Sequence, residues 1–141
     1  MSKYFKMSEL TRSGKADELG IDNVPSAEDN AHLEELMAVL DDIREYYGKS
    51  IRITSGYRCP KLNKAVNGSD TSAHKYGYAA DMQPANDTLK NFVEMIKEWA
   101  EDKNFDQILI EKNSKGSRWV HFGLYDNKGH QRRELKNLYV E

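Results

Sequence analysis

The sequence predicts an α+β fold in which helices pack against a small, mainly antiparallel sheet, in one domain spanning residues 1–141. Two long stretches carry apolar residues at the three- and four-residue spacing of amphipathic helices. Four short segments have the composition or the flanking turns typical of strands. The last two of these are separated only by a short glycine-containing loop, which favours an antiparallel hairpin. A length of 141 residues fits a single domain of ordinary size.

The N-terminal arm, residues 1–24, is expected to be irregular with one or two short helical turns. Ser13 is a suitable N-cap for such a turn, and Gly20 is suited to end it. The first long helix is expected to begin after Ser26, a second suitable N-cap, and to end at Gly48. Its apolar positions form one buried stripe, made of Leu33, Leu36, Met37, Leu40, Ile43 and Tyr47.

Two strands and two helices are predicted for the middle of the chain. Ile51–Ser55 is rich in β-branched residues and is the first predicted strand, and Pro60–Val66 can form a short helix. The second strand is predicted at Tyr78–Gln83, with Pro84 ending it. Asp87 is then expected to cap a second amphipathic helix, whose apolar positions are Leu89, Phe92, Val93, Ile96 and Trp99.

The predicted hairpin joins Asp106–Glu111 to Arg118–Gly123. If its loop is centred on Gly116, Glu111 lies opposite His121, because both are five residues from that centre. Directly opposed residues have Cβ atoms about 5 Å apart on one face of the sheet. The hairpin therefore predicts a carboxylate beside an imidazole.

The remaining features of the chain limit its partners and location. The C-terminal tail, residues 125–141, is polar and basic up to Leu138–Val140 and is expected to be solvated. With 21 basic and 23 acidic residues the net charge is −2, which argues against nucleic-acid binding by bulk positive charge. No apolar run approaches the length of a membrane span, so membrane insertion is not expected. The N-terminus lacks an apolar stretch typical of a signal peptide, so we expect synthesis in the cytoplasm. For the oligomeric state, a monomer is the default expectation.

Three residues have the character of metal ligands. His74 follows a loop rich in Gly, Ser and Asn, and Asp81 lies seven residues further on, in the second predicted strand. His121 lies in an apolar strand, where a core histidine and a ligand are both reasonable readings. Two histidines and one carboxylate are a typical protein ligand set for catalytic zinc. Such a site needs a base to accept the proton of the water, and Glu111 is the best candidate.

The sequence around these residues resembles a known family. The pattern Ser-x-His-x-x-Gly-x-Ala-x-Asp is met between Ser72 and Asp81, and Trp119-Val120-His121 follows downstream. Together with Ser55–Arg58, these motifs resemble the zinc D-alanyl-D-alanine carboxypeptidases and related peptidoglycan endopeptidases. These belong to the LAS metallopeptidases, whose hedgehog-like fold is α+β. The opening segment, including Gly20–Asn23, is similar to the short bacterial and bacteriophage branch, so the resemblance covers nearly the whole chain.

The resemblance implies one zinc ion held by His74, Asp81 and His121, and peptide hydrolysis by a water that the metal activates. It also implies that Arg58 binds a carboxylate or carbonyl oxygen of the substrate, which suits a planar guanidinium. Ser72 and Trp119 are the further residues expected to contact the substrate.

The chain departs from several relatives at one position. These relatives have an acidic catalytic residue three positions before the second histidine, where this chain has Arg118. In the short branch, an acidic residue at the end of the preceding strand takes that place, which here is Glu111. The resemblance and the hairpin geometry thus favour the same residue.

The expected function is therefore hydrolysis of peptidoglycan stem-peptide bonds, by a carboxypeptidase or by an endolysin-like endopeptidase. Two alternatives stay open: a non-catalytic zinc-containing module that binds the wall or belongs to a virion, and a cytoplasmic D-Ala-D-Ala dipeptidase. Without a signal peptide, action on the cell wall would require release by another protein.

Overall fold

The computed structural model describes residues 2–138 and confirms the α+β prediction. Its sheet has five strands in the order β1-β2-β4-β3-β5. Neighbouring strands are antiparallel except β3 and β5, which are parallel. The strands are β1 (Ile51–Ser55), β2 (Ala79–Pro84), β3 (Gln107–Lys112), β4 (Arg118–Gly123) and β5 (Glu134–Lys136).

The helices begin and end close to the predicted caps. They are α1 (Met7–Thr11), α2 (Gly14–Leu19), α3 (Ala27–Tyr47), α4 (Pro60–Ala65) and α5 (Leu89–Ala100), with one 3-10 helix, η1 (Ala73–Tyr76). The side chains of Ser13 and Ser26 accept hydrogen bonds from the first turns of α2 and α3. Gly20 and Gly48 end these two helices with positive φ angles of 65° and 75°. The arm thus contains the short helical turns that the sequence predicts.

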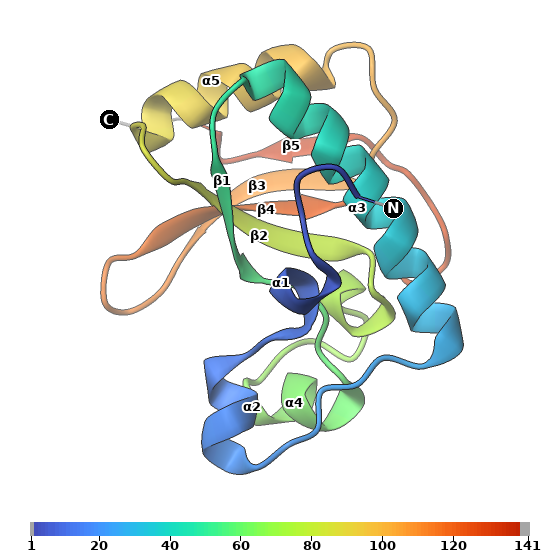
Figure 1. The fold of residues 1–141 in the computed structure, drawn as a ribbon. Helices are drawn as coiled ribbons and strands as arrows, with labels where there is room; N and C mark the ends of the chain where they lie inside the picture. Colours follow the sequence, from blue (N-terminus) through green and yellow to red (C-terminus); the bar gives the residue numbers. More distant parts are fainter. Residues whose placement is uncertain (1, 139–141) are drawn as a thin grey trace.

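The two faces of the sheet have different roles. In Figure 1, α3 and α5 lie against the sheet, and α1, α2 and α4 gather at the end of the molecule where β1 ends. Alternate strand residues such as Met82, Val120 and Phe122 are fully buried in the core with Phe92 and Ile96 of α5. The intervening positions face the opposite side of the sheet, where the polar site described below is located.

Two boundaries differ from the predictions. Thr88, not Asp87, caps α5, because its side chain accepts a hydrogen bond from Asn91 N. The Asp87 carboxylate instead accepts from Tyr47 Oη at 2.7 Å and so links α5 to the end of α3. Strand β2 also includes Pro84, which pairs with Ile51 of β1 but lies beyond Met82, where the pairing of β2 with β4 ends.

The predicted hairpin register is wrong by two residues. Glu111 pairs with Trp119, and His121 pairs with Leu109. The cause is the loop: Asn113 N donates to Ser117 O at 3.0 Å, so the turn is centred one residue earlier than Gly116. A two-residue shift leaves every side chain on its original face, so Glu111 and His121 still share one side of the sheet.

The tail is largely exposed up to residue 137, as predicted, but it also returns to the sheet as β5, which the sequence did not predict. Arg132 makes two hydrogen bonds of 2.8 and 2.9 Å to the buried carboxylate of Asp106. Arg133 donates to the carbonyl oxygens of Ala100 and Lys103, where α5 has ended. Leu138 is buried, whereas the predicted apolar end at Val140 lies outside the described residues.

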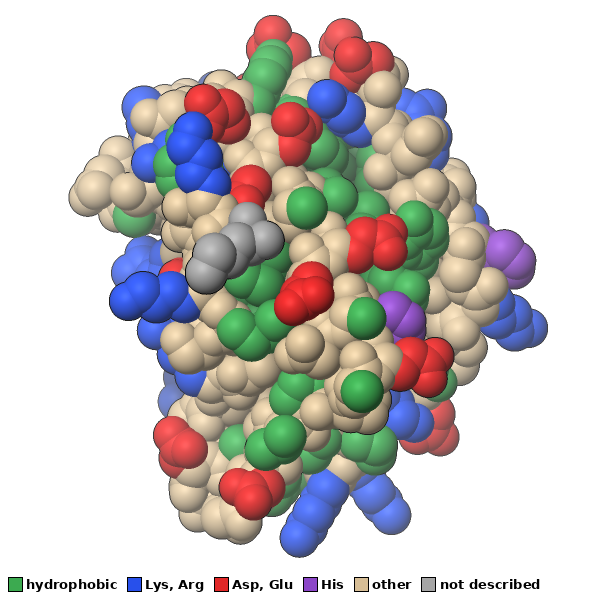
Figure 2. All heavy atoms as spheres, turned by 45° about the vertical axis from the view of Figure 1, so that its right-hand side comes forward, with side chains coloured by type: hydrophobic (Ala, Val, Ile, Leu, Met, Phe, Trp, Pro, Cys, Tyr) green, Lys and Arg blue, Asp and Glu red, His purple; other side chains and the backbone are tan. Residues whose placement is uncertain are grey.

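The surface carries both signs of charge. On the side seen in Figure 2, acidic and basic side chains are interspersed with hydrophobic ones and form no field of a single sign. Within residues 2–138, no helix has the length and apolar character needed to cross a membrane.

Candidate metal centre

Three buried side chains from separate elements meet on the open face of the sheet. His74 comes from η1, and Asp81 and His121 are direct cross-strand partners on β2 and β4. Asp81 Oδ1 lies 3.2 Å from His74 Nε2 and 3.1 Å from His121 Nδ1. Each residue is at most 8% exposed. The structure therefore brings together the three ligands that the sequence suggests.

The chemistry of these donors fits a divalent cation. His74 Nδ1 lies 2.7 Å from the carbonyl oxygen of Gly56, which can only accept, so Nδ1 carries the proton. In the neutral ring, Nε2 then points a lone pair at a carboxylate oxygen 3.2 Å away, which is repulsive unless a positive ion is shared between them. Ligands about 2.0 Å from a tetrahedral metal are separated by about 3.3 Å, close to the distances found here.

The backbone around Gly56 explains how His74 is oriented. A Cβ atom at this position would lie 2.3 Å from the carbonyl oxygen of Leu10, so only glycine fits. Arg58 N also donates to His74 O at 3.0 Å. The segment after β1 thus fixes both the ring and the backbone of the first candidate ligand.

Charges within the site shift the pKa values of two of its members. Burial alone raises the pKa of Asp81, but His74 and His121 outweigh it and hold that pKa well below its usual range. Burial lowers the pKa of His121, but its hydrogen bond to Asp81 and the charges of Asp81 and Glu111 outweigh burial, so the net shift of this pKa is upward. The two shifts have opposite origins: the imidazoles favour the ionised form of Asp81, and the carboxylates favour a positive charge at His121. The carboxylates would favour a bound cation in the same way.

Arg58 lies beside these three residues. Its Nη2 donates to Ser72 Oγ at 3.1 Å, while its Nε is buried and has no hydrogen-bond partner among the described residues. Burial lowers the pKa of Arg58, and the nearby charges of Asp81 and Glu111 oppose that shift. Ser72 Oγ also accepts from His74 N, so this hydroxyl connects Arg58 to the start of η1.

Glu111 and Trp119 form the more exposed side of the site. Glu111 Oε1 accepts a hydrogen bond of 3.0 Å from Trp119 Nε1 and lies 3.9 Å from His121 Nδ1. The Glu111 side chain is 41% exposed, in contrast to the buried candidate ligands. Trp119 therefore holds one carboxylate oxygen of Glu111 and leaves the other accessible.

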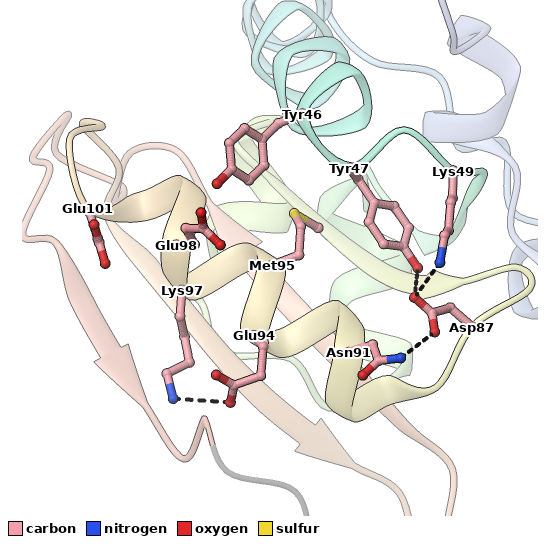
Figure 3. Close-up of a pocket in the computed structure, with 10 residues that line it drawn as sticks. All are labelled: Tyr46, Tyr47, Lys49, Asp87, Asn91, Glu94, Met95, Lys97, Glu98 and Glu101. Carbon is pink, nitrogen blue, oxygen red and sulfur yellow. Dashed lines mark hydrogen bonds and ion pairs between the residues drawn. The ribbon is translucent and has the colours of Figure 1, made fainter.

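All the candidate site residues line one cavity of about 560 Å³. A larger hollow, of about 880 Å³, lies between the end of α3 and α5 (Figure 3). Several of its side chains are occupied with one another, as Asp87 is with Tyr47 and Asn91. It contains none of the motif residues, so the smaller cavity is the candidate functional site.

Sequence reasoning missed one residue that supports this site. Asn23 Nδ2 donates to the carbonyl oxygens of Thr11 and Tyr57, and its Oδ1 accepts from Cys59 N, each at 2.8 Å. The N-terminal arm is thereby attached to both residues that flank Arg58. Asn23 lies in the opening segment that carries the resemblance, but its spacing from Arg58 gives no indication of this contact.

This fold and this site define a metal-dependent peptidase. A family model described as Peptidase M15 matches residues 3–123, and the chain belongs to that family. Membership indicates a zinc metallopeptidase, in agreement with the His-Asp-His set. A comparison with curated proteins gave no match.

Proposed function

We propose that this protein uses zinc to hydrolyse peptidoglycan stem peptides at a bond involving D-alanine. The observation that carries the proposal is the meeting of three unlike groups in one cavity: the buried His-Asp-His set, the guanidinium of Arg58 and the exposed carboxylate of Glu111. A module that only binds the wall would not need the carboxylate of Glu111 beside the metal ligands. Removal of a terminal D-alanine is the favoured reaction, because Arg58 suits a free carboxylate.

Each residue has a role in this proposal. When bound by His74, Asp81 and His121, zinc lowers the pKa of a water ligand and polarises the substrate carbonyl. The free oxygen of Glu111 accepts the proton of the attacking water and passes it to the departing amine. Trp119 fixes the orientation of Glu111 and forms part of the cavity that receives the substrate.

Arg58 is proposed to bind the substrate on the other side of the metal centre. One of its nitrogens is held by Ser72, which orients the planar guanidinium. Its remaining N–H groups can then bind the terminal carboxylate or the oxyanion that develops on the scissile carbonyl. Ser72 contributes by positioning Arg58 and lies close enough to contact the same end of the substrate.

The test is digestion of purified peptidoglycan, with the released fragments identified by mass spectrometry. We expect loss of D-alanine or cleavage of the stem, abolished by a chelator and restored by zinc. Restoration by another divalent ion alone would identify a different metal. Activity confined to free D-Ala-D-Ala would indicate a dipeptidase, and intact peptidoglycan with bound zinc would indicate a non-catalytic wall-binding module.

The proposed location follows from the proposed substrate. Synthesis in the cytoplasm would leave the enzyme on the cytoplasmic side of the membrane, whereas the stem peptides lie on the outer side. We therefore propose that another protein releases it to the wall. Expression in bacteria with and without a membrane-permeabilising protein tests this, because only the combination should cause lysis.

A further inference from the structure

Strand β5 brings a basic residue into the cavity of the metal centre. By register, Asp81 pairs with His121, His121 with Leu109, and Leu109 with Lys136. These four residues form one row across the sheet, and all four line the same cavity. The row runs from the metal centre, over the apolar side chain of Leu109, to the amine of Lys136.

The amine of Lys136 is available to a ligand. It donates no hydrogen bond to any residue in the described part of the chain, and its side chain is 56% exposed. Its closest carboxylate is that of Glu134, at 3.6 Å, and Glu134 already accepts a hydrogen bond of 2.7 Å from Gln107. The neighbouring Asp106 carboxylate accepts hydrogen bonds from Nε and Nη2 of Arg132.

Arg58 and Lys136 enter the cavity from opposite edges of the sheet. Arg58 follows β1, one edge strand, and Lys136 lies on β5, the other. Strands are about 4.8 Å apart, so two strand spacings separate His121 from Lys136 by about 10 Å. An extended peptide covers that distance in about three residues.

We propose that Lys136 determines specificity by binding a second carboxylate of the substrate, two to three residues from the scissile bond on its acyl side. This inference rests on the proposed function, with Arg58 binding the terminal carboxylate. The ligand is thus a peptide with a negative charge at each end of the cavity. In stem peptides that second carboxylate can belong to the third residue, when it is diaminopimelate, or to the second, when it is isoglutamate.

The test compares pentapeptides that end in D-Ala-D-Ala and differ by one carboxylate. One pair has meso-diaminopimelate or L-lysine at the third position, and the other has D-isoglutamate or D-isoglutamine at the second. We expect kcat/KM to be about threefold to fivefold higher for one acidic member, as for an exposed ion pair. Lys136→Gln should abolish that preference, Lys136→Arg should retain it, and Lys128→Gln, in an exposed turn, is the matched control.

Binding of the product tetrapeptides, measured by calorimetry, separates this inference from the proposed reaction. Tighter binding of the acidic tetrapeptide that is lost in Lys136→Gln would support the inference even if no peptide were cleaved. Cleavage of all pentapeptides without a preference for either carboxylate would overturn it and leave the proposed reaction intact. A preference that persists in Lys136→Gln would also overturn it.

Discussion

Among the single residues of the site, Asp81 is the one on which the others converge. One of its oxygens lies within 3.2 Å of both imidazoles, and the residue is 6% exposed. A buried carboxylate that faces two nitrogens is costly unless a positive charge is shared among them. The neighbouring Glu111 is only half-buried: Trp119 donates a hydrogen bond to one of its oxygens, and His121 lies 3.9 Å from that same oxygen.

This difference predicts the result of replacing Glu111. Glu111→Gln keeps an oxygen for the Trp119 hydrogen bond but removes the proton acceptor. We expect kcat on a stem peptide to fall by a factor of about 10²–10⁴, with zinc content unchanged by elemental analysis. Glu98→Gln, on the distant helix α5, is the control and should behave as wild type. Unchanged kcat in Glu111→Gln would exclude Glu111 as the base.

At the scale of elements, the hairpin shows what the sequence can and cannot predict. Both strands and the shared face of Glu111 and His121 could be predicted, because side chains alternate with a period of two. The register could not, since it depends on how Asn113 closes the loop. Strand β5 was also missed: it is three residues long, and its parallel pairing with β3 depends on the distant Arg132–Asp106 contact.

The attachment of the arm gives a second prediction. Asn23→Ala removes three hydrogen bonds: one to Thr11 within the arm, and two that join the arm to Tyr57 and Cys59. We expect a loss of about 2–3 kcal/mol in the free energy of unfolding, measured in urea. kcat/KM should fall as well, because Arg58 lies between these two anchors. Asp22→Ala, at an exposed neighbouring position, should change neither quantity, and an equally stable Asn23→Ala would refute the role of the arm.

The junction of α3 with α5 gives a pH-dependent prediction. The hydrogen bond from Tyr47, followed by those from Asn91 and Thr88, holds the pKa of Asp87 well below its usual range. A depressed pKa in the folded state stabilises the protein above the unfolded-state pKa of about 4, and this contribution is lost as the pH falls further. Asp87→Asn should therefore lower the melting temperature at pH 7, with a smaller difference at pH 3. A difference that grows on acidification would contradict this assignment.

Considered as a whole, the molecule separates stability from chemistry across its sheet. The face covered by α3 and α5 contains the apolar core, with Phe92, Met82 and Phe122 fully buried. The opposite face carries the polar cavity, whose walls come from the loop after β1, from η1 and from β5. His121 is 40 residues from Asp81 along the chain, so a bound ion would tie β4 to β2 and η1 at a single point.

This arrangement predicts that zinc stabilises the entire fold. An ion that binds only the folded state raises the free energy of unfolding by about 2.7 kcal/mol at 100 times its dissociation constant. We expect a chelator to lower the melting temperature and added zinc to restore it. His121→Ala removes one of three ligands, so its melting temperature should respond to neither reagent. His130→Ala, in an exposed turn, should respond as wild type does. A zinc response that survives in His121→Ala would place the ion elsewhere.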